Sequence, residues 1–199
     1  MELRDKNGLT EAEFLAAYSP GDFPRPSVTA DILVFAQQHK QLELLMIKRG
    51  GHPCLGMWAL PGGFSNPDES LDKTALRELE EETHIKGLLL KQIGLFSAPN
   101  RDPRTWVITC AYMGIIEKEN LMVQADDDAS DSEWFTISTE QHDGQMDLKL
   151  TSPKAILSAR LEIQEIQTRM GIHREINMIS SDGIAFDHAK IIATALFHL

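Results

Sequence analysis

The segment Gly63–Ile85, GFSNPDESLDKTALRELEEETHI, decides how this chain folds and what it can bind. It holds seven acidic residues and only two basic ones. Between Leu71 and Thr83 the apolar residues recur with the period of a helix, so the pattern predicts a helix there. At about 100° per residue, a carboxylate face lies beside the apolar face. That face carries Glu78, Glu81 and Glu82.

Three carboxylates on one helix face have two interpretations. On an exposed helix each like-charge pair costs only about 0.2 to 0.5 kcal/mol, so the face could simply be solvated. Beside a sheet, at an effective dielectric of about 20, the repulsion rises to about 3 kcal/mol per pair. A hard cation would remove that repulsion, and ligands that are all oxygen favour Mg²⁺, Mn²⁺ or Ca²⁺ over zinc.

The spacing of this segment resembles the Nudix box, G-x5-E-x7-R-E-U-x-E-E-x-G-U, in which U is aliphatic. Eight of the nine specified positions match, from Gly63 through Glu69 and Arg77 to Ile85. The departure is His84, where the family has the glycine that favours a left-handed helix end. The resemblance implies an α/β protein with the Nudix fold, a mixed β-sheet sandwiched between helices (α/β/α).

The resemblance also implies a site for Mg²⁺ or Mn²⁺ built from this segment. Arg77 would orient the glutamates through ion pairs, and Glu69 would brace the loop before the helix. Glu81 would reach the metal directly or through water, which makes Glu81 and Arg77 candidate catalytic residues. The implied metal ligands are Glu78, Glu82, Glu81 and a carbonyl of Gly62 or Gly63.

A second acidic stretch, Asp126–Glu133, contains five acidic residues and no basic one. Hydrolysis needs a general base, which in Nudix relatives is often a box glutamate or an acid on a later loop. Asp127, Asp128 and Glu133 are therefore candidates for the base or for a further metal ligand. The alternative is a solvated loop.

Further patches resemble the branch of ADP-ribose pyrophosphatase-like proteins. They are Gly56–Phe64, Arg101–Arg104, Asp127–Ala129 with Trp134 and Phe135, and Phe186–Lys190. The implied reaction is metal-dependent hydrolysis of a nucleoside diphosphate linked to another moiety, first of all ADP-ribose to AMP and ribose 5-phosphate. Two alternatives stay open: a hydrolase that removes damaged nucleoside triphosphates, and an ADP-ribose-sensing transcription regulator.

An anionic substrate needs local positive charge in an acidic protein. Arg49, Arg101 and Arg104 are the candidate partners for substrate phosphate or ribose, and each could instead be an ordinary surface arginine. Phe64 could stack on the base, although packing in the core is the more common role of such a ring.

Composition limits the partners. The chain has 199 residues and a net charge of −11, which argues against a protein that neutralises phosphates with a broad basic face. Residues 151–199 hold five basic and five acidic residues, so we expect no nucleic-acid partner. No apolar run is long enough for a bilayer, and the charged start is unlike a secretory signal, so we expect a cytoplasmic protein with no membrane partner. The resemblance implies a homodimer.

The pattern predicts two parts. Residues 1–26 form a helix at Thr10–Tyr18 and a proline-rich linker, and residues 27–199 form the Nudix domain with its C-terminal helices. Cys54 and Cys110 are too few for a disulfide framework. The expected strands are 28–34, 42–47, 58–60, 93–96, 106–116 and 134–137, and the expected C-terminal helices run from Ser152 to Arg169 and from Asp187 to His198.

Overall fold

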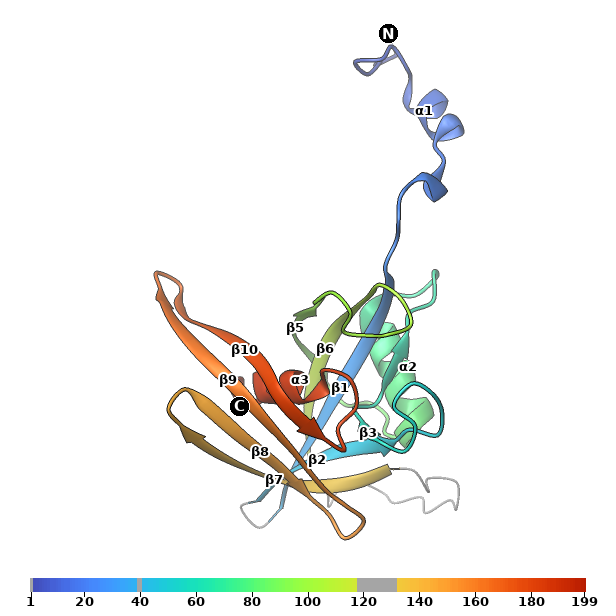
Figure 1. Cartoon of the computed structure of the whole chain (residues 1–199). Coiled ribbons are helices and arrows are strands. Elements are labelled where there is room, and N and C mark those ends of the chain that lie inside the picture. The colour runs from blue at the N-terminus through green and yellow to red at the C-terminus, as the bar shows by residue number, and fades with distance from the viewer. Residues whose placement is uncertain (1, 39–40, 118–131) are drawn as a thin grey trace.

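The computed structural model describes residues 2–38, 41–117 and 132–199 (Figure 1). Its described strands join into one curled mixed sheet, in the order β10-β9-β8-β7-β2-β1-β6-β5, with β3 paired to β2 and β4 to β1. The pairing of β1 with β6 is parallel, and the other pairings are antiparallel. The strands are β1 (Ser27–Gln38), β2 (Gln41–Lys48), β3 (Trp58–Ala59), β4 (Gly62–Phe64), β5 (Lys91–Phe96), β6 (Val107–Ile116), β7 (Ser132–His142), β8 (Gln145–Thr151), β9 (Ile156–Thr168) and β10 (Gly171–Asp182), and the helices are α1 (Glu11–Ala17), η1 (Pro20–Asp22), α2 (Leu71–Thr83) and α3 (His188–Leu196).

Strand β1 explains why a helix covers each face of the sheet. Its side chains alternate between two faces, and both faces are apolar and buried, as expected for a central strand. Ile32 and Val34 pack in the cluster that includes Leu79 of α2. Leu33 and Phe35 pack in the larger cluster that includes α3. The predicted α/β/α sandwich is confirmed.

Helix α2 begins and ends where the sequence predicts. The Ser70 side chain caps its start by accepting a hydrogen bond from the Lys73 backbone N–H. His84 ends it in the left-handed conformation, with φ 60° and ψ 9°. His84 therefore adopts the conformation for which the family uses glycine, and its N–H bonds the Glu80 carbonyl at 2.9 Å.

The segment after residue 151 differs from the prediction. The helix expected from Ser152 to Arg169 is wrong, because Ile156–Thr168 is strand β9, paired with β8 and β10. Leu157, Ala159 and Leu161 are buried and the residues between them are exposed, which is the two-residue period of a strand. Ser152 caps a turn rather than a helix, since its hydroxyl accepts from the Lys154 and Ala155 N–H groups.

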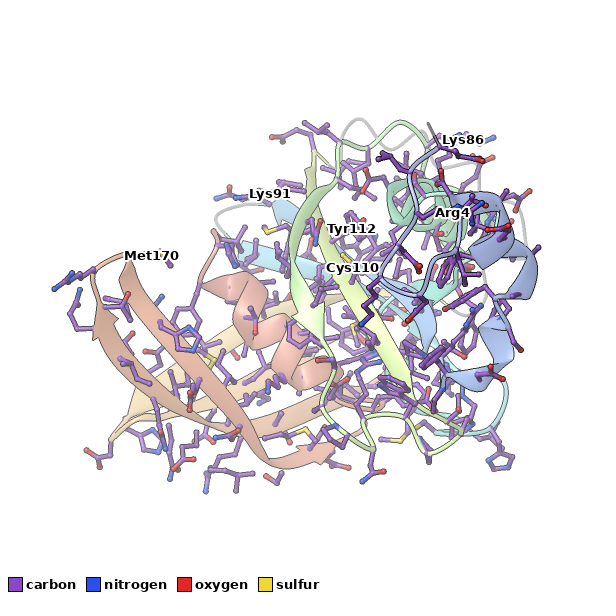
Figure 2. The ribbon with its side chains drawn as sticks, turned by 90° about the horizontal axis from the view of Figure 1, so that it is seen from above. Arg4, Lys86, Lys91, Cys110, Tyr112 and Met170 are labelled. Carbon is purple, nitrogen blue, oxygen red and sulfur yellow. The ribbon has the colours of Figure 1, made fainter. Side chains whose placement is uncertain are left out.

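The last helix is confirmed, as α3, and the β7 to β10 hairpins curl around it (Figure 1). Strands β8 and β10 were not predicted. Residues 152–199 hold one described helix where two were expected, because most of the other expected helix is strand β9. Seen from above, Cys110 and Tyr112 lie on β6 in the body of the molecule, and Met170 lies at the tip of the β9–β10 hairpin (Figure 2).

The N-terminal part stands away from the sheet (Figure 1). Thr10 and Glu13 form the predicted capping box of α1, which buries none of its residues. Within the described residues no helix is long and apolar enough to cross a bilayer. Cys54 and Cys110 are free thiols.

The packing of α2 on β1 yields a stability prediction. Leu79 is fully buried, so Leu79→Ala should lower the free energy of unfolding by about 2 to 5 kcal/mol through the cavity it leaves. Leu76 lies on the same helix and is 43% exposed, so Leu76→Ala should cost less than about 1 kcal/mol. Urea denaturation of both variants measures this, and equal losses would contradict the packing described here.

Candidate active site

A cleft of about 460 Å³ lies where β1, β4 and α2 meet the corner between β10 and α3. Its walls carry both acidic and basic side chains, which is unusual for a simple surface hollow. The charged residues that line it are Asp31, Arg49, Arg77, Glu78, Glu82, Arg101, Asp102 and Arg104.

Two glycines bring the floor of the cleft against α2. Gly62 has φ 152°, and a Cβ there would collide with the carbonyl oxygen of Ala30 on β1. A Cβ on Gly63 would lie 2.5 Å from the Glu78 carboxylate. Gly62 therefore requires glycine, because a side chain there would collide with the backbone of β1, whereas a side chain at Gly63 would displace the Glu78 carboxylate from its present position.

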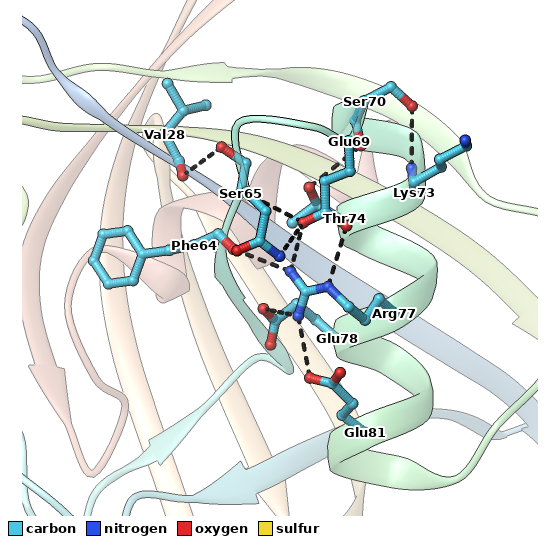
Figure 3. Close-up of polar contacts among 11 residues, drawn as sticks. Val28, Phe64, Ser65, Glu69, Ser70, Lys73, Thr74, Arg77, Glu78 and Glu81 are labelled. Atoms are coloured by element: carbon cyan, nitrogen blue, oxygen red, sulfur yellow. Dashed lines mark hydrogen bonds and ion pairs between the residues drawn. The ribbon is translucent and has the colours of Figure 1, made fainter.

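Arg77 ties this loop to the helix (Figure 3). Its guanidinium pairs with Glu69 at 2.7 Å, with Glu78 at 2.7 Å and with Glu81 at 3.1 Å. It also donates to the Phe64 carbonyl at 3.1 Å. The bonds from Arg77 lower the pKa of Glu69 to about 2, so this carboxylate stays charged. The geometry is that of a residue that orients the glutamates, as expected.

Glu82 is a partly buried acid of the predicted metal set. Its carboxylate accepts the Gly62 N–H at 2.7 Å. Its pKa is raised to about 7, mainly by burial and also by the charges of Glu78 and Asp31, while the Gly62 bond and Arg49 oppose the rise. A cleft that holds several carboxylates at this cost is suited to a cation.

The donor set fits a hard divalent ion. Glu78 and Glu82 line the cleft beside the backbone of Gly63, so the candidate donors there are all oxygen. Among the residues that the structure describes, no three His, Cys, Asp or Glu side chains are grouped as a metal site. The Glu81 side chain is 58% exposed and its carboxylate pairs with Arg77.

The predicted substrate residues Arg49, Arg101, Arg104 and Phe64 all line the cleft. Arg101 is buried between two carboxylates, Asp187 at 2.6 Å and Asp31 at 3.5 Å. Arg104 pairs with Asp102 at 2.7 Å and lies over the Phe64 ring at 5.1 Å. Phe64 is 42% exposed, so its ring is not a core residue.

The candidates for the general base outside the box are not in the described cleft. Asp127 and Asp128 lie outside the described residues. Glu133 is on β7, where it pairs with Lys154 at 2.9 Å, and it does not line the cleft. These three assignments stay predictions.

Asp31, Phe186 and His188 are among the cleft residues that sequence reasoning did not predict for the site. The Leu60 N–H donates to Nδ1 of buried His188 at 2.9 Å, which leaves the hydrogen of the neutral ring on Nε2. Burial lowers the pKa of His188, so the ring is neutral at physiological pH. One signal was available for Asp31, a carboxylate within an apolar central strand. Phe186 and His188 gave none apart from the family-like end of the chain.

The chain belongs to the NUDIX domain family, whose match spans residues 25–154. It is 36% identical over 133 residues to the ADPR responsive transcriptional repressor NtrR of Acinetobacter baylyi, covering 66% of this chain and 53% of that protein. It is 34% identical over 113 residues to the ADP-ribose pyrophosphatase of Methanocaldococcus jannaschii, covering 57% of this chain and 63% of that protein. The chain thus spans less than two thirds of either relative.

Two solved structures are similar. A MutT/nudix family protein from Enterococcus faecalis has a TM-score of 0.71 and 33% identity, covering 96% of this chain and 69% of that one. The NUDIX domain of Shewanella oneidensis NrtR, complexed with ADP ribose, has a TM-score of 0.55 and 37% identity, covering 63% of this chain and 82% of that one. The Nudix fold and the likeness to ADP-ribose-related proteins, both expected from the sequence, are confirmed.

The raised pKa of Glu82 yields a prediction for the protein in EDTA. A carboxyl whose pKa rises from 4.5 to about 7 on folding binds its proton more tightly when folded, so it destabilises the fold progressively between these pH values. At pH 8 Glu82→Gln should therefore raise the free energy of unfolding, by up to about 3 kcal/mol.

Below pH 4.5 the same substitution should give no gain, since the wild-type carboxyl is then protonated in both states. Glu80→Gln is the matched control, because Glu80 pairs with Lys86 on the exposed side of α2. Chemical denaturation at several pH values measures both variants. A gain for Glu82→Gln that is independent of pH would contradict this assignment.

Proposed function

We propose that this protein is a Mg²⁺- or Mn²⁺-dependent hydrolase that cleaves ADP-ribose to AMP and ribose 5-phosphate. The observation that carries the proposal is the cleft itself, which places Glu78 and Glu82 opposite a set of arginines. The similarity to an ADP-ribose pyrophosphatase and to an ADP-ribose complex supports the choice of ligand.

Glu78, Glu82 and the Gly63 carbonyl would hold the ion, with Glu81 joining them directly or through water. The bound ion supplies a Lewis acid that lowers the pKa of a water and stabilises charge on the leaving phosphate. The Gly62 N–H keeps the Glu82 carboxylate aimed into the cleft. Arg77 holds the Glu78 carboxylate in place through an ion pair.

Glu81 is the proposed proton acceptor among the described residues. It is the most solvent-exposed of the three glutamates, and its single bond to Arg77 restrains the side chain without enclosing it. A carboxylate held in this way can accept a proton from an attacking water in reach of the cleft. Asp127 and Asp128 remain alternatives for the same role.

The proposal predicts that the wild-type protein with Mg²⁺ or Mn²⁺ converts ADP-ribose and one water into AMP and ribose 5-phosphate, both detectable by chromatography. EDTA should abolish turnover. Glu82→Gln should lower kcat by at least about 100-fold because it removes a charged metal ligand without a change in volume. Glu80→Gln should behave as wild type, because its side chain faces Lys86.

Comparison of kcat/KM across substrates tests the substrate class. A larger value for nucleoside triphosphates than for ADP-ribose would replace the proposal with nucleotide clean-up. Full activity of Glu82→Gln would remove Glu82 from the ligand set.

The second candidate is an ADP-ribose-sensing regulator, favoured by the 36% identity to a transcriptional repressor. The box acids are intact, and residues 151–199 have equal numbers of basic and acidic residues, which favours the enzyme. If the protein is such a regulator, it should bind a specific DNA duplex at physiological salt, and ADP-ribose should change that binding. A mobility-shift experiment with and without ADP-ribose, on genomic fragments, separates the two.

A further inference from the structure

The arginines of the cleft are not equivalent. Arg77, Arg101 and Arg104 each pair with at least one carboxylate at 2.7 Å or less. Arg49 has no carboxylate partner within the described residues. Its positive charge is therefore the least neutralised of the four, in a protein of net charge −11.

Arg49 is nevertheless held in place. Its Nε donates to the Pro53 carbonyl at 2.8 Å. Its guanidinium carbon lies 4.8 Å from the centre of the Phe186 ring. The Pro53 bond uses the Nε edge and the ring uses one face, so the two terminal amino groups have no acceptor in the part of the chain that the structure describes. They are free to bind an anion.

Phe186, the ring in this contact, has an unusual backbone conformation. Its φ is 52°, in the left-handed region that a phenylalanine rarely occupies. The corner around it is fixed to β3, since the Trp58 N–H donates to the Gly183 carbonyl at 2.8 Å and the Ala185 N–H donates to the Trp58 carbonyl at 2.8 Å. Such strain persists where neighbouring structure imposes it, often at ligand sites.

We propose that Phe186 is a positioning residue that holds the Arg49 guanidinium, with its charge intact, for a phosphate of the diphosphate ligand. The proposal rests on the proposed function in taking that ligand to be a diphosphate. An aromatic face attracts a guanidinium without cancelling its charge, whereas a carboxylate partner would neutralise it. Arg104 lies 5.9 Å from the same ring and already pairs with Asp102, so Arg49 carries the effect.

The probe is methylenediphosphonate, a diphosphate analogue whose P–C–P bridge resists hydrolysis, titrated calorimetrically in buffer with Mg²⁺. Arg49→Ala should weaken its binding by about tenfold or more. Phe186→Leu keeps bulk but loses the π face and should weaken binding by about three- to thirtyfold. Phe186→Tyr keeps the face and should bind within about twofold of wild type.

Arg174 provides a matched control. Its guanidinium lies 4.2 Å from the Phe197 ring, the same kind of contact outside the cleft. Arg174→Ala should bind the probe like wild type. Thermal denaturation of each variant keeps loss of the fold apart from loss of binding. In ADP-ribose hydrolysis, Phe186→Leu should raise KM and leave kcat close to wild type, because Glu78 and Glu82 are untouched.

The proposal would be overturned if folded Phe186→Leu bound the probe with wild-type affinity. It would also be overturned if Phe186→Tyr weakened probe binding as much as Phe186→Leu does, or if Arg174→Ala weakened it as much as Arg49→Ala does. If Phe186→Leu loses binding of adenosine while its affinity for the probe is unchanged, Phe186 is a base-stacking residue. That result would also overturn the proposal. If the probe binds as predicted but ADP-ribose is not hydrolysed, the proposed function fails and this inference stands. If ADP-ribose is hydrolysed and Phe186→Leu changes neither KM nor probe binding, the proposed function stands and this inference fails.

Discussion

The contact between strand β4, which begins with Gly62 and Gly63, and helix α2 is the constraint on which the site depends. A side chain at Gly62 would collide with the backbone of β1, and one at Gly63 would displace the Glu78 carboxylate. That approach brings the Gly62 N–H to Glu82 and the Phe64 carbonyl to Arg77. One strand therefore aligns the carboxylates of the helix, and the sheet beneath keeps that strand in place through the pairing of β4 with β1.

Electrostatic balance in the cleft follows from how each arginine is paired. Arg77 is surrounded by the carboxylates it orients, and Arg101 is buried between Asp31 and Asp187. The charge of each of these two arginines is therefore balanced by carboxylates of the protein itself. Arg49 instead rests on a ring and a carbonyl, so its charge remains available. The sequence offered Arg49, Arg101 and Arg104 as candidate substrate partners, and the structure shows that their surroundings differ in charge.

The sequence predicted the parts of the molecule that depend on local pattern. Helix α2 and the spacing of the box residues follow from periodicity and from positions close together in the chain. Strand β9 was mistaken for a helix because Ser152 followed by proline imitates a helix start, and its register is fixed by hairpin partners that the local pattern does not reveal. Pairing with neighbouring strands, rather than local propensity, decides whether such a segment becomes a strand or a helix.

The same reasoning explains which site residues could not be predicted. Phe186 and His188 reach the cleft only because the sheet curls around α3 and brings the β10–α3 corner against β3, more than 100 residues away in sequence. Nothing in the local sequence marks that approach. The family match spans residues 25–154, but the β10–α3 corner, which lies beyond it, supplies one wall of the cleft. A substitution at this corner would therefore change a wall of the cleft without altering the box acids on α2.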